Sequence, residues 1–327
     1  MTGAGLEIVS VEDQAAFWDD RATVAACMEE SPPRIPAWFG YDSLGSHLFE
    51  AITELPSYYL TRVERELLRR NAAQIAELIN CRRLAELGSG SAKKTRLLLS
   101  ACLQRGPTTY LPIDVSREML EISGATLTAE LPGLTVLGLW GRYEAALGWL
   151  RDRSREPLVV ALLGSNLGNA TSAERDALLR EIAATLRPGD GFLVSVDLHK
   201  STEILEACYN DPPHCSAFVQ FRLNHLAHLN RRFGADFVLD NFRSRAHYDL
   251  ATAVVEAHLY AAADQIVSLP GLDLVLRLRH GQSINVGFSA KFHHAAFVAD
   301  IAMFDLVLQA QWIDPVWQYG IFLFRRA

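Results

Sequence analysis

The feature that most constrains this fold is the alternation of short apolar runs with helical patterns between residues 82 and 197. The apolar runs predict strands over residues 82–88, 108–115, 134–140, 158–164 and 192–198. The helical patterns between them begin near Lys93 and cover residues 116–131, 142–150 and 173–186. Strands that alternate with helices are joined by right-handed crossovers. We therefore predict an α/β fold with a doubly wound, mostly parallel, Rossmann-like sheet.

Helix boundaries and flanking segments complete this outline. Ser116 is a predicted N-cap, as is either Thr171 or Ser172. The spacing of apolar residues predicts a further helix over residues 61–80. The C-terminal segment predicts a helix near 294–303 and a closing antiparallel hairpin. Residues 200–285 mix one helical segment with alternating strands, so we expect a second, α+β domain. The predicted domains are residues 61–197 with 286–327, which bind the nucleotide, and residues 1–60 with 198–285, which bind the substrate.

Composition excludes several function classes. The net charge is −7 and the pI is near 5.8, whereas nucleic-acid binders normally carry a basic surplus. Apolar runs fall short of the roughly 20 residues that span a bilayer. The N-terminus lacks the basic and apolar regions of a secretory signal, and the 5 cysteines are scattered without a CxxC pair. We expect a reduced, cytoplasmic monomer that binds neither nucleic acid nor a membrane.

A glycine-rich turn, 86-ELGSGSAKKT, follows the first predicted strand. A Walker A loop would need a glycine at position 93, where Lys93 stands, and the dinucleotide pattern GxGxxG fails at the same place. A GxSxG nucleophile elbow is also absent there. What remains is an acid, an apolar residue and GxG, which opens the nucleotide site of Rossmann-like S-adenosylmethionine methyltransferases. That cofactor carries no phosphate, so close approach of the Gly88 and Gly90 backbone meets its needs.

A carboxylate ends the second strand of the predicted sheet. Asp114 lies 26 positions after Gly88, and an acid at this point can accept both hydroxyls of a ribose. The alternative is a tight turn between strand and helix, with Asp114 serving only as a cap. The local pattern leaves both open.

Longer stretches of the chain resemble a known family. They are 38-WFGYDSLGSHLFEAITELPSYYLTRVE, 86-ELGSGSAKKTRLLL, 112-PIDVS, 163-LGSNLGN and 289-SAKF. Together they resemble the histidine-specific Nα-methyltransferases of ergothioneine biosynthesis, which convert histidine to its trimethylated betaine. The resemblance runs from about residue 31 to the end. It implies a class I methyltransferase fold, S-adenosylmethionine as cofactor and the α-amino group of a free amino acid as target.

The resemblance also implies residue roles. Gly88, Lys94 and Asp114 match cofactor-binding positions, and Tyr41 matches a tyrosine near the sulfonium and the amine. The positions that match substrate-binding residues are Tyr58, Gly164, Asn169, Tyr209 and Ser216. For methyl transfer, Asn169 and Tyr209 would hold the carboxylate, while Tyr41 would relay the amine proton through water. Two alternatives stay open: Tyr58 can be ordinary aromatic packing, and Asn169 can cap the next helix.

Two departures from the family lie in the expected substrate pocket. The histidine enzymes have a glutamate two residues before the serine of their SxKF motif, but here Gly287 precedes Ser289. Ala257 stands where the histidine enzyme carries a methionine. Both changes enlarge the pocket and make it less polar, and the glycine at 287 removes an acceptor for the imidazole. We therefore expect an aromatic amino acid such as tryptophan. The alternative is that Phe288 or His258 refills the space and histidine is still the substrate.

A third departure concerns the adenine. The family has an acid in a GDF stretch after the third strand, whereas 141-GRYE places Arg142 and Tyr143 there. We expect the Tyr143 amide to meet the adenine edge and the Arg142 guanidinium to stack on the ring.

Other readings of the sequence are weaker. The pairs His225 with His228 and His293 with His294 lack a third ligand, so we expect no metal. Because Arg142 replaces the acid expected at the adenine, a second alternative is a regulatory protein that binds the cofactor without catalytic activity. A methyltransferase acting on an amine of a specialised pathway is the remaining alternative.

Overall fold

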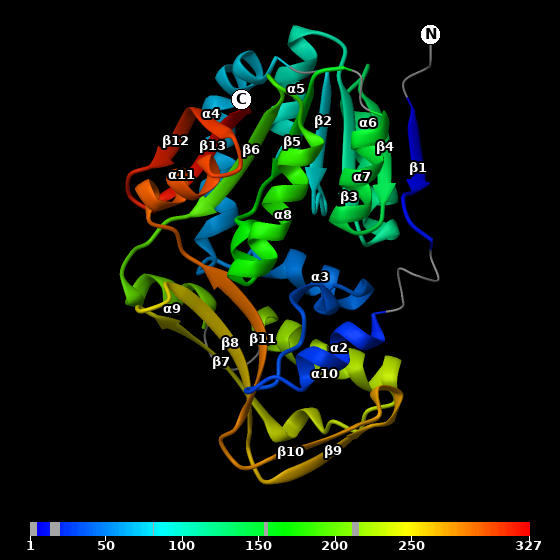
Figure 1. Ribbon diagram of the computed structural model, residues 1–327, viewed down its shortest axis with the longest axis vertical. Coiled ribbons are helices and arrows are strands. Elements are labelled where there is room, and N and C mark those ends of the chain that lie inside the picture. Colours follow the sequence, from blue (N-terminus) through cyan, green and yellow to red (C-terminus); the bar gives the residue numbers. More distant parts are fainter. Residues whose placement is uncertain (1–4, 14–19, 81, 154–155, 211–215) are drawn as a thin grey trace. The chain divides into compact units, whose positions relative to one another are not determined.

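The computed structural model describes residues 5–13, 20–80, 82–153, 156–210 and 216–327 (Figure 1). Cys81 and Cys215 lie outside the described residues. The chain forms two compact units. The first comprises Met1–Gln14, Leu60–His199 and Lys291–Ala327, and the second comprises Ala15–Tyr59 and Lys200–Ala290.

The first unit is built on an eight-stranded sheet with the order β1-β4-β3-β2-β5-β6-β13-β12. Its strands are β1 (Leu6–Ser10), β2 (Arg83–Leu87), β3 (Thr109–Asp114), β4 (Thr135–Trp140), β5 (Leu158–Leu162), β6 (Gly191–Asp197), β12 (Leu306–Asp314) and β13 (Tyr319–Arg326). All neighbouring pairs from β1 to β6 are parallel, while β13 pairs antiparallel with both β6 and β12. The predicted α/β class and the antiparallel C-terminal hairpin are therefore confirmed.

Helices cover both faces of this sheet. They are α4 (Tyr59–Ile79), α5 (Thr95–Arg105), α6 (Arg117–Glu130), α7 (Tyr143–Arg153), α8 (Ser172–Thr185) and α11 (His294–Ala302). In Figure 1, α7 and α8 lie in front of the sheet and α5 lies behind it. Every residue of β5 and β6 is buried, because a parallel strand covered on both faces needs apolar side chains at successive positions.

Helix caps agree with the sequence prediction. The Ser116 side chain accepts the Met119 amide at 3.2 Å and caps α6. At α8, Thr171 is the N-cap and forms a capping box with Glu174. Asn169 is therefore not the cap of that helix, and the capping alternative for its role is wrong.

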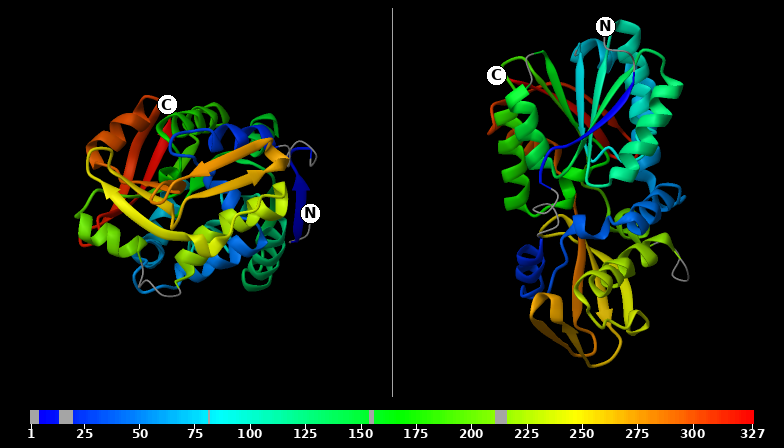
Figure 2. Two further views of the ribbon diagram at one scale, coloured as in Figure 1. Left: turned by 90° about the horizontal axis from the view of Figure 1, so that it is seen from below. Right: turned by 90° about the vertical axis from the view of Figure 1, so that its right-hand side faces the viewer.

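The N-terminal segment corrects the predicted domain boundaries. Residues 1–60 were assigned as a whole to the second domain, yet β1 pairs in parallel with β4 at the edge of the large sheet (Figure 2, right). The exposed backbone of β4 offers unpaired hydrogen-bonding groups, which β1 satisfies. Residues 286–290 were assigned to the first domain, but they belong to β11 (Ser283–Ala290), which pairs with β8 (Val254–Ala261) in the second unit.

The second unit is α+β. A three-stranded antiparallel sheet has the order β11-β8-β7, with β7 at Phe242–Asp249, and a two-stranded ribbon joins β9 (Gln265–Leu269) to β10 (Leu274–Leu278). The helices are α2 (Arg21–Met28), α3 (Ser43–Thr53), α9 (Thr202–Tyr209) and α10 (Ala217–Phe233). A core from α2, α10 and the strands holds the unit together, with Val24, Leu226, Leu229 and Leu259 fully buried. Among the described residues, no helix combines the length and apolarity that crossing a membrane requires.

Candidate active site

The glycine turn after β2 has the backbone conformation that its sequence predicted. Gly88 has φ +69° and Gly90 has φ +50°, both in the left-handed region that favours glycine. A Cβ at Gly88 would overlap the Tyr143 hydroxyl. A Cβ at Gly90 would meet, its chain neighbours aside, no atom of the described residues within 4 Å, so the backbone there borders open space within the described part of the chain. Such a turn suits a ligand that approaches the main chain closely and carries no phosphate.

Asp114 at the end of β3 is held in place by backbone donors. One carboxylate oxygen accepts the Gly90 amide at 3.0 Å, and the other accepts the Ser116 amide at 2.9 Å. Burial raises the pKa of Asp114, and these amides oppose the shift. Each oxygen keeps a further lone pair, so the fixed carboxylate can also accept hydroxyl donors. The turn and this acid together fit the nucleoside part of S-adenosylmethionine.

Glu86, the acid of the motif, has a structural role. It is buried, and its two oxygens accept the Thr95 hydroxyl at 2.8 Å and the Tyr110 hydroxyl. Burial raises the pKa of Glu86 to about 7. Glu86 thus links β2 to β3 and to the start of α5. In the Lys94-Thr95 pair, which imitates the end of a phosphate loop, the threonine therefore makes a structural hydrogen bond to Glu86.

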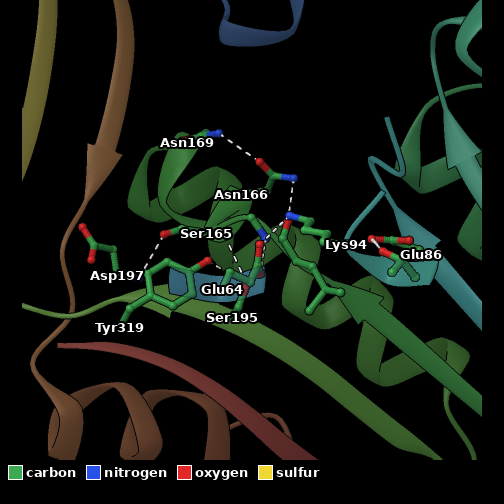
Figure 3. A network of polar contacts seen from close by, with 12 residues as sticks. Glu64, Glu86, Lys94, Ser165, Asn166, Asn169, Ser195, Asp197 and Tyr319 are labelled. Atoms are coloured by element: carbon green, nitrogen blue, oxygen red, sulfur yellow. Dashed lines mark hydrogen bonds and ion pairs between the residues drawn. The ribbon is translucent and has the colours of Figure 1, made fainter. Parts of the chain in front are cut away.

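Lys94 belongs to a network centred on Glu64, a residue that the sequence analysis did not single out (Figure 3). The Glu64 side chain is fully buried, and one oxygen lies 2.6 Å from the Lys94 ammonium. The other oxygen accepts the Gly164 amide at 2.8 Å and the Ser195 hydroxyl. One helical carboxylate therefore fixes two predicted site positions, Lys94 and Gly164. The available signal was an acid within the apolar side of the predicted helix at 61–80.

The segment after β5 presents Asn169. Gly164 has φ +87° and Ser165 has φ +59°, so the chain turns sharply into a short 3-10 helix over Asn166–Asn169. The Asn169 amide donates to Asn166 at 3.3 Å, and the Asn166 amide donates to the Leu163 carbonyl at 2.9 Å (Figure 3). Two asparagine side chains therefore lie together at the carboxyl end of β5, beside the Lys94 and Glu64 pair.

Arg142 has an acidic partner. Glu12, which follows β1, accepts the Arg142 backbone amide at 2.6 Å and the guanidinium at 3.1 and 3.2 Å. Sequence reasoning missed Glu12 because 130 residues separate the two positions. Glu12 therefore places a carboxylate near the end of β4, close in sequence to the position where the family has its own acid. Stacking of Arg142 on adenine stays a prediction.

The predicted tyrosines of the second unit form an aromatic cluster. Ring centroids of Tyr41 and Phe221 are 5.3 Å apart, those of Tyr58 and Phe218 are 5.6 Å apart, and those of Tyr58 and Tyr209 are 6.1 Å apart. Edge-to-face contacts of this kind fix the orientation of the rings. Ser216 differs, because its hydroxyl accepts the Val219 amide and caps α10.

The two pocket positions with altered residues are cross-strand neighbours. Gly287 lies opposite Ala257, and a Cβ built at Gly287 would lie 3.8 Å from the Ala257 Cβ. Apart from the chain neighbours, the described residues place no other atom within 4 Å of it. Ser289 follows two residues later on the same face, and its hydroxyl lies 2.7 Å from the Tyr209 hydroxyl. This face therefore carries a glycine, an alanine and a serine.

Phe288 and His258 lie on the other face of the same sheet. In the register, Phe288 lies opposite Glu256 and His258 lies opposite Asn285, one residue away from the Gly287 and Ala257 pair on each strand. Successive side chains in a strand point to opposite faces. Phe288 and His258 therefore do not share the face of Gly287, which argues against either side chain refilling the space there. Histidine as the substrate stays an alternative prediction.

The histidine pairs noted in the sequence make protein contacts. On α10, His225 Nδ1 lies 3.0 Å from the Phe221 carbonyl and His228 Nδ1 lies 2.8 Å from the Phe39 carbonyl. Burial lowers the pKa of His225 to about 4, which keeps the ring neutral at neutral pH. These rings serve packing in the second unit.

Comparison with known proteins shows which family this chain resembles. A family described as histidine-specific, S-adenosylmethionine-dependent methyltransferases matches residues 20–326. The histidine N-alpha-methyltransferase of Mycolicibacterium smegmatis is 37% identical over 310 residues and covers 93% of each chain. That of Mycobacterium tuberculosis is 34% identical over 304 residues, 93% of this chain and 94% of the relative. The L-tryptophan methyltransferase trpM of Psilocybe serbica is 25% identical over 295 residues, 82% of this chain and 81% of the relative.

The family match spans nearly the whole chain. The first unit of this chain has the parallel sheet, the glycine turn and the strand-end acid that a methyltransferase of this class needs. The chain is therefore an S-adenosylmethionine-dependent N-methyltransferase, and it belongs to the histidine-specific methyltransferase family.

Proposed function

We propose that this enzyme methylates the α-amino group of a free aromatic amino acid, above all tryptophan, up to the trimethylated betaine. The observation that carries the proposal is the face shared by Gly287 and Ala257. Apart from its chain neighbours, the only described atom within 4 Å of a Cβ built at Gly287 is the Ala257 Cβ. We propose that these two small residues leave room for a ring.

Cofactor binding is assigned to the first unit. We propose that Gly88, Gly90 and Asp114 hold the nucleoside, and that Lys94 and the Tyr143 amide contribute further contacts, with Arg142 beside the adenine. Asp114 is already oriented by two backbone amides, so little freedom is lost when it binds a ribose. S-adenosylmethionine supplies an electrophilic methyl group when bound.

The chain's own residues orient the amino acid. We propose that Asn169 and Tyr209 bind the carboxylate, that the Gly164 carbonyl and Asn169 orient the amine, and that Tyr41 passes its proton to water. Positioning is the main catalytic demand, because the leaving group is activated in the cofactor itself. Asn169 suits this role because it does not cap α8, and its side chain is held only by a 3.3 Å hydrogen bond that its amide donates to Asn166 among the contacts described. Each methylated product keeps its carboxylate, so the same anchors serve up to three transfers.

Specificity follows from what the pocket face lacks. A buried imidazole N–H without an acceptor costs about 1–3 kcal/mol, which disfavours histidine where no acid is present. An indole ring gains from apolar contact at the same place. We propose that Tyr58 and Ser289 complete the ring site, and Ser216 its margin. The similarity to an L-tryptophan methyltransferase is consistent with this choice.

Histidine is the second candidate substrate. The identity of 37% to a histidine N-alpha-methyltransferase favours it, because substrate preference is commonly shared at that level of similarity across a whole chain. We propose that the residues at 257 and 287 determine which of the two amino acids the enzyme prefers. A cofactor-binding regulator without turnover is the outcome if no amino acid is methylated.

The test is mass spectrometry of the purified enzyme with S-adenosylmethionine and the twenty amino acids. We expect gains of one to three methyl groups on tryptophan. Methylation of histidine alone would overturn the proposed specificity.

A pair of variants then isolates the selector. Gly287→Glu places an acid where the structure has room for a side chain, and Gly287→Ala is the control for added volume. A charged hydrogen bond to the imidazole is worth about 1.5–3 kcal/mol, so Gly287→Glu should raise the histidine-to-tryptophan ratio of kcat/KM by about 10- to 100-fold. An equal shift in Gly287→Ala would assign the effect to volume and refute the role of the acid.

A further inference from the structure

We infer that the second unit carries a binding site for a divalent transition-metal ion of the zinc class, formed by His247, Glu256 and His258. This site is independent of the proposed function. Glu256 and His258 lie two residues apart on β8, and His247 lies directly opposite Glu256 on β7. All three side chains therefore extend from one face of the sheet.

The ligand atoms of the cluster converge. His258 Nε2 lies 3.1 Å and His247 Nε2 lies 3.7 Å from the same oxygen of Glu256, and one ligand atom from each residue falls within 4.8 Å of the others. Two imidazoles and one carboxylate are a ligand set that binds zinc and related ions and leaves coordination positions for water. Small rotations of the side chains would bring these atoms to metal-ligand distances.

His258 is oriented for coordination. Its Nδ1 lies 3.0 Å from the Ser283 hydroxyl, and the Asn285 amide nitrogen lies 3.4 Å from its Nε2. The Asn285 oxygen accepts the Gly287 amide, so its NH2 group is the part that faces the ring. The 3.1 Å contact between Nε2 and the Glu256 carboxylate is a hydrogen bond in which Nε2–H donates, so the metal-free ring carries its proton on Nε2. A bound cation would displace that proton, and the ring would then coordinate through Nε2 while Nδ1–H donates to the Ser283 hydroxyl. A metal-bound histidine characteristically has its second nitrogen held in this way.

Access to the cluster is open from solvent. The His247 side chain is 39% exposed and Glu256 is 31% exposed, whereas His258 is 6% exposed. Asp249 lies on the same face, two residues from His247, and adds negative charge nearby. Arg245, opposite His258, is exposed, so water screens its positive charge. A bound ion would link β7 to β8 on the face opposite Ala257.

The test uses the tag-free, chelator-treated full chain and titration with Co²⁺, which reports coordination by its visible absorption, followed by competition with Zn²⁺. We expect one equivalent to bind with a spectrum typical of nitrogen and oxygen ligands. His247→Gln, Glu256→Gln and His258→Gln should each weaken binding by about 100-fold or more, and Ser283→Ala by about 10-fold. His280→Gln, an exposed histidine in the same unit, is the control and should bind as the parent does.

Two results would overturn the inference. One is Co²⁺ affinity unchanged in His247→Gln and His258→Gln, with folding of each variant verified by circular dichroism. The other is a sulfur-to-cobalt charge-transfer band, which would place the ion on a cysteine. The amino-acid methylation assay reports the proposed function separately, so neither result bears on that function.

Discussion

The ion pair between Glu64 and Lys94 offers a quantitative test of how the active-site segments are held. Glu64 is fully buried, while 20% of the Lys94 side chain is exposed. In Glu64→Gln, the amide oxygen can keep the Gly164 and Ser195 donors, but its NH2 group then faces the Lys94 ammonium. Breaking one partner of a buried pair costs about 3–5 kcal/mol, and the partial exposure of Lys94 favours the lower value.

The double-mutant cycle separates the ion pair from other effects. Lys94→Met leaves the Glu64 carboxylate buried with its two neutral donors, so we also expect a loss of about 3 kcal/mol in the free energy of unfolding. Glu64→Gln with Lys94→Met removes both charges and should lose about 2 kcal/mol less than the sum of the single losses. Urea unfolding measures each value. Additive losses would refute the coupling between Glu64 and Lys94.

Three further changes test the remaining parts of the first unit. Gly88→Ala should weaken S-adenosylhomocysteine binding, because its Cβ would overlap the Tyr143 hydroxyl. Adding Tyr143→Phe removes that hydroxyl and should restore part of the affinity. Calorimetry that finds no restoration would contradict the contact. Asp114→Asn should weaken the same binding by about 10-fold or more without changing the preferred amino acid, since a hydrogen bond to a charged group contributes about 1.5–3 kcal/mol; unchanged affinity would exclude the ribose role. Burial raises the pKa of Glu86 from 4.5 to about 7, so the folded state holds a proton that the unfolded state releases, and stability falls as pH rises between these values. Glu86→Gln should therefore gain stability relative to the parent over this range, by about 3 kcal/mol; a difference that does not vary with pH in urea unfolding would contradict the shift.

The sheet of the first unit was predictable because its strands are buried on both faces. Continuous apolar runs such as those of β5 and β6 stand out from the helices around them. β1 was missed because five residues at a sheet edge carry too little pattern, and its partner β4 is more than 120 residues away in sequence. The boundary near residue 286 was misplaced because β11 pairs with β8, which only the register reveals.

In the candidate site too, the residues defined by local sequence patterns were predictable, whereas those held by contacts between distant parts of the chain were not. The turn at Gly88 and Gly90 and the acid at Asp114 follow from short-range patterns, and the structure joins them through the hydrogen bond from the Gly90 amide to Asp114. Their contacts with the cofactor stay a prediction. Glu64 and Glu12 act through contacts across about 100 residues or more, so a sequence pattern cannot pair them with Gly164 and Arg142.

The orientation of the pocket strands also required the structure. The register of β11 shifts between Asn285 and Gly287, and this irregularity places Gly287 opposite Ala257. A shift of one residue would exchange the two faces and bring Phe288 beside Ala257. The register of β7 on β8 likewise brings together His247, Glu256 and His258, which gave no motif in the sequence.

The most direct test of the proposed specificity is the affinity of the enzyme and S-adenosylhomocysteine complex for free tryptophan and free histidine, measured by calorimetry under one set of conditions. An unpaired imidazole donor costs about 1–3 kcal/mol, so we expect tryptophan to bind about 5- to 150-fold more tightly than histidine. Tighter binding of histidine would contradict the proposal that Gly287 and Ala257 select an aromatic amino acid.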